Sequence, residues 1–346
     1  MDAGAWHRAA TAAGAPQPPR LTLDELAALS SAAREDHAGA VRDYLLGMRL
    51  AADPLIQLAD AISDEVDINA LTGPGAKRIV AVTAENTAGK STLVRTWARV
   101  RYRRWVDPLS LASPEIPTWT PEPGMRAHHT PVVWVNLQAD TKVKDFDVQV
   151  LRFFGYEPRG TIQALTSHMT DALRRHGVRV LVIDDVHWLR TTRVLGRAVL
   201  DHLKHVNTEI GEFGATLLLV GANLDGGDIV TDPQVAGRLR MLHLPTFTVD
   251  SDGGRLAWQQ LLRRSESVLL PYLPAARPGL LANKLAGPIW KRTQGYLGDT
   301  AALLLRASAK AAVEGSWTVS RELLATIPLS KRAEEAEARG QRRSGS

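Results

Sequence analysis

The chain has 346 residues, of which 45% are hydrophobic and 23% are charged, and its formal net charge is +5. This length and composition predict a folded protein of about two structural units and exclude an extended, disordered polyelectrolyte. Cysteine is absent, which excludes disulfides, thiolate metal sites and cysteine nucleophiles, and which suits a reducing, cytoplasmic location. The positive charge favours polyanionic partners such as nucleic acid without identifying one.

The N-terminal part of the chain lacks the features of a targeting or membrane segment. No cationic start is followed by an apolar run, and about 18 consecutive apolar residues occur nowhere, so we expect no signal peptide, no membrane span and no membrane partner. Residues 1–20 include an Ala- and Pro-rich stretch and are expected to be disordered. Residues 21–72 place apolar residues at helical spacing, which predicts a helical segment ahead of the first domain.

Residues 73–248 alternate between strand-like and helical patterns. The strand-like runs are short, apolar and β-branched, namely residues 78–83 (RIVAVT), 131–137 (PVVWVNL), 178–183 (VRVLVI) and 215–220 (ATLLLV). Such runs suit strands buried on both faces, and their alternation with helices predicts a three-layer α/β core with a parallel sheet. Residues 107–130 are rich in Pro and lack periodicity, so we expect an irregular insertion there.

Residues 249–329 carry helical periodicity throughout. The expected helices cover residues 253–265, 280–293, 300–312 and 318–324. This pattern predicts a small all-α lid domain after the α/β core. Residues 330–346 are charged without an apolar stripe, so they are expected to form a flexible tail.

A phosphate-loop pattern follows the first expected strand. Residues 84–91 (AENTAGKS) match G-x-x-x-x-G-K-[ST] except that Ala84 replaces the first glycine, and a helix follows. Backbone N–H groups of such a loop cradle phosphates, while Lys90 would reach the β and γ phosphates and Ser91 would hold Mg²⁺. The candidate ATP-binding residues are Ala84, Glu85, Asn86, Thr87, Ala88, Gly89, Lys90, Ser91 and Thr92.

Polar residues end two further apolar strands. Residues 180–183 (VLVI) run into Asp184 and Asp185, a pair suited to hold Mg²⁺ and to polarise an attacking water, respectively. Asn223 follows the strand that begins near residue 215, where it could hydrogen-bond the γ phosphate or the attacking water; an ordinary turn asparagine is the alternative. Together with the phosphate loop, the carboxylate pair predicts binding and hydrolysis of ATP·Mg²⁺.

The arginines suggest two different roles. On the helix of residues 91–105 they lie away from the apolar face, which favours a solvated cationic face, at Arg95, Arg99, Arg103 and Arg104. Arg238 could instead act across a subunit boundary as an arginine finger that stabilises charge in the transition state. Arg240 competes for this role, and a structural salt bridge is the alternative for either residue.

The order and spacing of these motifs resemble the TniB/TnsC ATPases, which are AAA+ regulators of DNA transposition similar in role to MuB. The similarity extends from about residue 79 to residue 315. Besides the phosphate loop, it rests on residues 131–136 (PVVWVN), 151–155 (LRFFG), 183–189 (IDDVHWL), 200–204 (LDHLK), 220–221 (VG), 232–238 (DPQVAGR) and 295–298 (GYLG).

The resemblance implies an ATP-dependent homo-oligomer, a ring or filament, on double-stranded DNA. Such an assembly would select target sites and recruit or activate a transposase, with a target-selection protein as a further partner. Sequence-independent phosphate contacts would come from the loop after the second strand, where Thr141, Lys142 and Lys144 cluster. A solvated loop is the alternative for each of these residues.

Four residues depart from the family pattern, namely Ala84 for glycine, Asp185 for glutamate, Ala222 for threonine and Leu239 for phenylalanine. The shorter side chain of Asp185 predicts slow hydrolysis, because the carboxylate reaches less far toward the attacking water. Two alternatives therefore stay open. One is a signalling switch of the STAND type that binds nucleotide tightly, and the other is a nucleotide-binding scaffold impaired in hydrolysis.

Overall fold

The structure is a computed structural model, and it describes residues 1–86, 88–186, 194–226, 230 and 232–344. The chain forms two compact units. The core unit comprises Met1–Ala12, Gln57–Asn86 and Lys90–Leu244, and the helical unit comprises Ala13–Ile56, Thr87–Gly89 and Pro245–Ser346. The end of the core unit lies close to the expected boundary at residue 248, whereas the expected helical segment of residues 21–72 is divided between the units.

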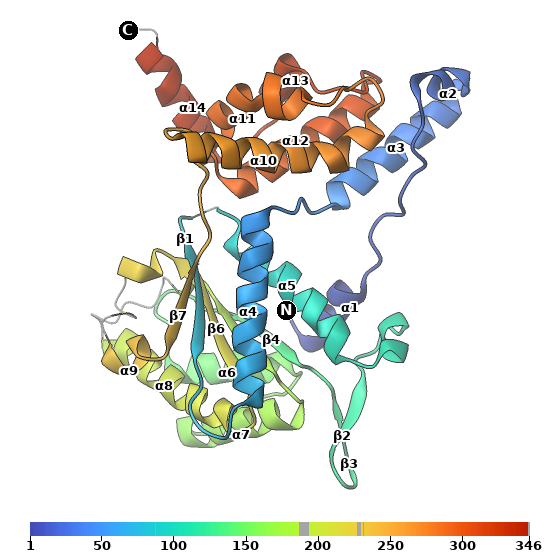
Figure 1. Cartoon of the computed structure of the whole chain (residues 1–346). Coiled ribbons are helices and arrows are strands. Elements are labelled where there is room, and N and C mark those ends of the chain that lie inside the picture. Colours follow the sequence, from blue (N-terminus) through green and yellow to red (C-terminus); the bar gives the residue numbers. More distant parts are fainter. Residues whose placement is uncertain (87, 187–193, 227–229, 231, 345–346) are drawn as a thin grey trace. The chain divides into compact units, whose positions relative to one another are not determined.

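The core unit is built on a five-stranded sheet in the order β4-β5-β6-β1-β7, in which every pair of neighbours is parallel (Figure 1). The strands are β1 (Ile79–Ala84), β4 (Val132–Asn136), β5 (Val180–Asp184), β6 (Thr216–Ala222) and β7 (Leu239–His243). The first four match the predicted runs. The edge strand β7 was not predicted, because only one of its five residues is buried and it lacks a continuous apolar run.

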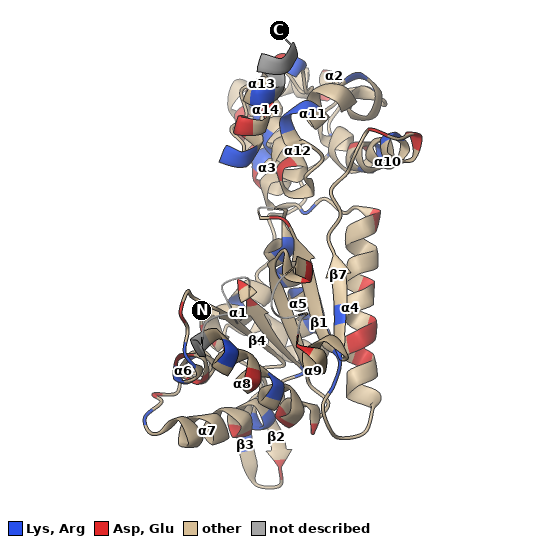
Figure 2. Cartoon of the chain, turned by 90° about the vertical axis from the view of Figure 1, so that its left-hand side faces the viewer, with Lys and Arg blue, Asp and Glu red and all other residues tan. Residues whose placement is uncertain are grey.

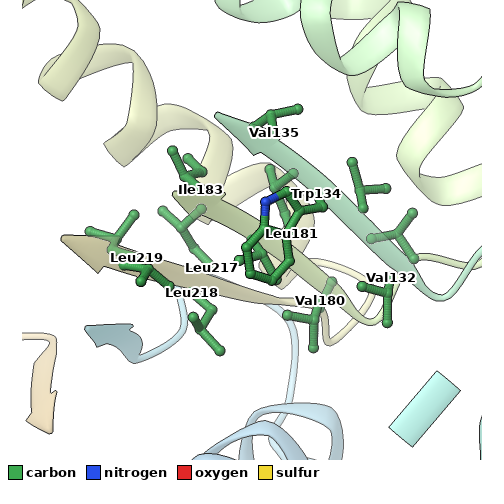
Figure 3. Packing of buried hydrophobic residues seen from close by; sticks show 14 of the residues in the cluster. Val132, Trp134, Val135, Val180, Leu181, Ile183, Leu217, Leu218 and Leu219 are labelled. Carbon is green, nitrogen blue, oxygen red and sulfur yellow. The ribbon is translucent and has the colours of Figure 1, made fainter. Parts of the chain in front are cut away.

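The sheet is buried on both faces by flanking helices. Strands β5 and β6 have only buried residues, so their side chains are apolar at consecutive positions rather than alternate ones. Figure 3 shows the packing of β4, β5 and β6 through Val132, Trp134, Val135, Val180, Leu181, Ile183, Leu217, Leu218 and Leu219. Figure 2 shows α4 (Asp53–Leu71) on the opposite face of the sheet from α6 (Val143–Phe153), α7 (Ile162–Arg175) and α8 (Val194–Gly211).

The expectation of disorder over residues 1–20 is wrong for α1 (Ala3–Thr11), which packs on α5 (Lys90–Trp105). Trp6 is fully buried and stacks on Trp134 with ring centroids 5.9 Å apart. The imidazole of His7 hydrogen-bonds the Tyr102 hydroxyl and the Ser113 carbonyl, both at 2.8 Å. These partners lie far along the sequence, so local composition could not predict the helix.

The insertion after α5 is more regular than expected. It contains a 3₁₀ helix, η1 (Pro108–Ala112), and an antiparallel hairpin of β2 (Thr118–Glu122) and β3 (Met125–His128). Trp119 anchors the hairpin, because its indole Nε1 donates to the Arg175 carbonyl at 3.0 Å and its ring stacks on His129 at 5.1 Å. The polar and Pro-rich strands conceal the hairpin in the sequence.

The helical unit contains α2 (Leu23–Ala28), α3 (Ser31–Gly47), α10 (Asp252–Leu269), α11 (Ala286–Thr293), α12 (Leu297–Val313) and α13 (Arg321–Ala325). Helix α3 packs against α12, which explains why residues before the core join this unit. The helix expected over residues 280–293 is divided into a π-helical turn, Leu280–Lys284, and α11. Gly295 has φ 72°, and a Cβ there would clash with the Phe247 carbonyl, so glycine is required.

The expectation of a flexible tail is wrong for α14 (Lys331–Ser344), which forms a helix on the helical unit. Glu337 accepts from the guanidinium of Arg292 at 3.0 Å, and Arg332 pairs with Asp299. These ion pairs, rather than an apolar stripe, hold the helix, so hydrophobic periodicity did not reveal it. Among the described helices of the whole chain, none is long and apolar enough to cross a membrane.

Candidate nucleotide-binding site

The carboxyl edge of the sheet gathers the predicted nucleotide-binding residues. Strand β1 ends at Ala84, which pairs with Ala222 at the end of β6, and β5 ends at Asp184 on the other side of β6. Because parallel strands end at the same edge, the phosphate loop, the carboxylate pair and Asn223 emerge side by side. Strand β6 separates β1 from β5, so Asn223 leaves the sheet between the loop and the carboxylates.

The phosphate loop folds back around its own lysine. Lys90 is the first residue of α5 and is 8% exposed, and its ammonium donates to the Ala84 carbonyl at 3.1 Å and to the Glu85 carbonyl at 2.7 Å. Burial lowers the pKa of Lys90, while Asp184 and the other nearby carboxylates oppose this shift. Gly89 has φ 102°, a backbone conformation that favours glycine.

The other candidate loop residues differ in exposure. Ala88 is buried, whereas Glu85, Asn86 and Thr92 are exposed. Thr87 lies outside the described residues, as does His187 in the segment after the carboxylate pair. Ala84 is accommodated as the last residue of β1, in the position where the motif has its first glycine.

Ser91 and Asp184 form the pair expected to hold a metal ion. The Ser91 hydroxyl donates to Asp184 Oδ1 at 3.0 Å, and Asp184 is 3% exposed. Burial raises the pKa of Asp184, although the hydrogen bonds from Ser91 and from the Asp185 N–H act in the opposite direction. The Ser91 hydroxyl and the Asp184 carboxylate are hard oxygen ligands, and the hydrogen bonds to Asp184 do not fully offset the cost of burying its charge. Both features fit Mg²⁺, which binds one or two such ligands together with phosphate oxygens.

Asp185 and Asn223 both have left-handed backbone conformations, with φ 62° and φ 50°. Non-glycine residues rarely adopt this conformation, and Asp and Asn are the types that tolerate it best. The Asn223 N–H donates to the Ala84 carbonyl at 3.3 Å, and Thr83 Oγ1 accepts from the Leu224 N–H at 2.9 Å, so the turn after β6 is tied to the strand of the phosphate loop. Strained backbone at two neighbouring strand ends is typical of functional sites.

Arg95 belongs to this site, although the sequence favoured a solvated cationic face. Its guanidinium lies 4.0 Å from Asp184 Oδ2 and 4.8 Å above the ring of Trp134. The sequence contained a usable signal, because Arg95 follows Ser91 by four residues and residues at this spacing share a helix face.

Arg238 lies at the opposite edge of the sheet from the phosphate loop. It precedes β7, is exposed, and its carbonyl accepts from the Ile79 N–H at 2.9 Å, at the start of β1. The loop begins about five residues further along β1, roughly 16 Å away at 3.3 Å per residue. The structure therefore does not bring Arg238 to the phosphate loop of its own chain. Arg240 is also exposed and lies 3.7 Å from Glu65.

A buried carboxylate holds the segment that leads to Arg238. Asp232 is 3% exposed, caps the short helix α9 (Pro233–Ala236), and accepts from the Gln234 and Val235 N–H groups at 3.0 and 3.2 Å. Arg197 and Lys204 of α8 contact Asp232 Oδ2 at 2.9 and 3.1 Å. Although burial raises the pKa of Asp232, the bonds from Lys204 and the backbone prevail and the pKa is lowered. The ion pairs of Asp232 with Arg197 and Lys204 thus connect α8 to the segment that leads to Arg238.

The candidate DNA contacts follow β4 at the carboxyl edge. Thr141 closes the loop, since its hydroxyl donates to the Gln138 carbonyl at 2.7 Å. Lys142 and Lys144 are exposed where α6 begins, and the Lys142 N–H donates to Asp145 at 3.1 Å. The two ammonium groups are therefore available to solvent, whereas the hydroxyl of Thr141 is engaged within the loop.

Residues 74–225 match the family model of an AAA domain. Among solved structures, the ORC2 protein of Aeropyrum pernix in ADPNP–ADP complexes is similar with a TM-score of 0.50 and 14% identity, over 81% of this chain and 67% of that one. The core unit has the AAA+ fold. No curated protein sequence matches the chain.

Two other solved AAA+ chains are similar at a lower level. The Aeropyrum pernix ORC1 protein in complex with DNA has 18% identity and a TM-score of 0.48, over 85% of this chain and 68% of that one. Domain III of the Thermotoga maritima replication initiation protein DnaA has 11% identity and a TM-score of 0.45, over 81% and 92%. At these identities, the likeness concerns the fold alone.

Proposed function

We propose that this protein is an ATPase of the TniB/TnsC type that assembles on double-stranded DNA with ATP, selects target sites and recruits or activates a transposase. The observation that carries the nucleotide part is the contact between Ser91 and Asp184 at 3.0 Å beside the phosphate-loop lysine. The DNA part is supported by the motifs shared with the TniB/TnsC family and by the exposed Lys142 and Lys144.

Within this proposal, each residue at the carboxyl edge has one role. Lys90 and the loop N–H groups bind the phosphates, and Ser91 and Asp184 bind Mg²⁺, which when bound neutralises charge on the phosphates. Asp185 polarises the attacking water, and Asn223 orients that water or the γ phosphate. The ORC2 relative in its ADPNP–ADP complexes supports the assignment of adenine nucleotides as ligands.

Arg238 supplies the reason to propose an oligomer. It is exposed at the amino edge of the sheet, away from the phosphate loop of its own chain, so we assign it to the site of a neighbouring copy. An arginine finger in this position would make hydrolysis depend on assembly.

The short side chain of Asp185 favours a second candidate, a scaffold that binds ATP and hydrolyses it poorly. Its backbone is held at φ 62°, which fixes the direction in which the carboxylate leaves the strand. ATP binding and DNA assembly without hydrolysis would select this candidate over the ATPase.

The deciding experiment is binding of the purified protein to a random-sequence DNA duplex with ATP, with a non-hydrolysable analogue and without nucleotide, at two salt concentrations. Salt-sensitive binding that requires nucleotide and accompanies higher-order assembly is expected, because counterions leave the phosphates on binding. Nucleotide binding with no DNA binding in any state would refute the transposition role and favour a signalling switch.

A further inference from the structure

A cavity of about 600 Å³ lies beside the edge strand β4, between α5, α6 and the start of α1. Its polar side chains are Arg95, Arg152, Asn136, Gln138, Gln149 and Asp2. The single carboxylate, Asp2, already accepts from the Ala5 N–H at 2.7 Å as the cap of α1. Two guanidinium groups and three amides thus line the cavity against one carboxylate, and this excess of positive charge suits an anionic ligand.

Arg95 lines this cavity with a partly exposed guanidinium. Its Nε is buried and has no hydrogen-bond partner among the residues that the structure describes, although the side chain as a whole is 43% exposed. Trp134 fixes the guanidinium by stacking at 4.8 Å, which leaves the N–H groups at its rim to bind a ligand. Because Nε is shielded from solvent while the side chain is partly exposed, the terminal N–H groups are the ones that an anion in the cavity can reach.

The same guanidinium borders the metal-binding pair. Arg95 lies 4.0 Å from Asp184 Oδ2, the carboxylate that also accepts from Ser91. A cation in this place neutralises Asp184 in part, and it repels a second cation that approaches the same carboxylate. Arg95 is therefore shared by the cavity and the nucleotide site.

We propose that the cavity binds a phosphate of the DNA backbone and that Arg95 couples this binding to the binding of magnesium and nucleotide. The inference rests on the proposed function for its two ligands, and it adds their connection. A backbone phosphate that attracts Arg95 weakens its hold on Asp184 and lowers the repulsion of Mg²⁺. Because such coupling is reciprocal, ATP·Mg²⁺ strengthens DNA binding by the same factor.

The surroundings of the cavity favour DNA as the source of the phosphate. Lys144 and Arg152 lie eight residues apart on α6, about 12 Å at 1.5 Å per residue, and within about 80° of each other around its axis. Duplex DNA carries about one charge per 1.7 Å of its axis, so a duplex along α6 would present several phosphates over the distance between these two cations.

The opposite side of the core unit is unsuited to DNA. Figure 2 shows acidic residues along α4, and Asp60, Asp64 and Asp67 form an exposed stripe at helical spacing. Asp67 is paired with Arg101, but Asp60 and Asp64 would repel the phosphate backbone, whereas Arg95 and Arg152 line the cavity on the side of β4. This charge distribution favours DNA binding beside α6 over binding on the side of α4.

The test measures the Kd for a DNA duplex with and without a non-hydrolysable ATP analogue and Mg²⁺, in the parent, Arg95→Gln and Arg152→Gln. We expect the nucleotide to tighten DNA binding by the parent about tenfold, within the usual range of coupling. Arg95→Gln should reduce this ratio to about one, and it should bind the magnesium nucleotide without DNA at least as tightly as the parent does. Damage to the fold would weaken nucleotide binding instead.

Arg152→Gln separates coupling from simple phosphate binding. It should weaken DNA binding severalfold in both nucleotide states and lower the salt slope by about 0.9, while the tenfold ratio remains. Arg159→Gln, at a side chain that is 88% exposed, is the matched control and should change nothing. If the parent binds DNA with nucleotide and Arg95→Gln keeps the tenfold ratio between the two DNA Kd values, this inference is overturned and the proposed function is not. A parent that binds no DNA in any state overturns the proposed function as well.

Discussion

The two edges of the core sheet hold their functional residues in different settings. At the carboxyl edge, Lys90 and Asp184 are largely buried and contact the loop carbonyls and Ser91, respectively. At the amino edge, Arg238 is exposed and attached to the sheet only through its backbone carbonyl among the contacts described. This difference in setting is the basis of the proposal that one edge binds nucleotide within a single chain, whereas the other presents a cation to a second molecule.

The largest effect is expected from Arg238→Ala. Nucleotide binding should persist, while hydrolysis by the oligomer should fall about 10³-fold, because a finger supplied in trans contributes roughly this much. The measurement is steady-state ATPase activity against protein concentration. Mixing with Lys90→Ala copies, which retain Arg238, should restore activity. If Arg240→Ala causes the loss and Arg238→Ala does not, the finger has been assigned to the wrong arginine.

Lys90→Ala should weaken ATP·Mg²⁺ binding about 10²-fold, since charge-assisted hydrogen bonds contribute roughly 1.5–3 kcal/mol. Equilibrium binding of a fluorescent ATP analogue measures the loss. Lys331→Ala, at a side chain that is 89% exposed in the helical unit, is the control and should bind like the parent. Unchanged affinity in Lys90→Ala would exclude the phosphate-loop assignment.

Asp232→Asn tests whether α8 positions the amino-edge arginine. Asparagine still caps α9, but the charge that holds Arg197 and Lys204 is lost, so hydrolysis should fall about tenfold with nucleotide affinity unchanged. Asp201→Asn is the matched control, because Asp201 pairs with the same two cations while 51% exposed, and exposed pairs contribute little. Equal activity in both variants would show that the buried pairs do not position Arg238.

Asp184→Asn should stabilise the nucleotide-free protein at neutral pH by about 1 kcal/mol, or roughly 2–4 °C in Tm, while abolishing stabilisation by magnesium nucleotide. Burial raises the pKa of Asp184, so between the unfolded and the native pKa the folded protein keeps a proton that the unfolded chain releases. The stability of the parent therefore declines as the pH rises through the interval between these two pKa values. The gain in stability of Asp184→Asn over the parent should therefore vanish at pH values below the usual pKa of aspartate. Thermal melts across pH measure it, and a constant advantage would contradict the role of ionisation.

Strand periodicity and the motifs predicted from the sequence where the strands end and which polar residues follow them. Continuous apolar runs predicted four of the five strands, and the rule that parallel strands end together placed Asp184 and Asn223 beside the phosphate loop. The edge strand β7 was not predicted, because its exposed positions remove the apolar run. The roles of Asp185, Asn223 and Arg238 remain predictions until the variants are measured.

Tertiary structure alone decided which distant groups meet. The sequence favoured solvent for Arg95, but packing places it between Trp134 and Asp184. Trp6, near the N-terminus, stacks on Trp134 of β4, so α1 forms a helix where composition predicted disorder. A local pattern reports which residues share a strand or a helix face, because backbone geometry repeats over a few residues. Stacking and ion pairs between elements depend on how those elements are brought together, which no local repeat encodes.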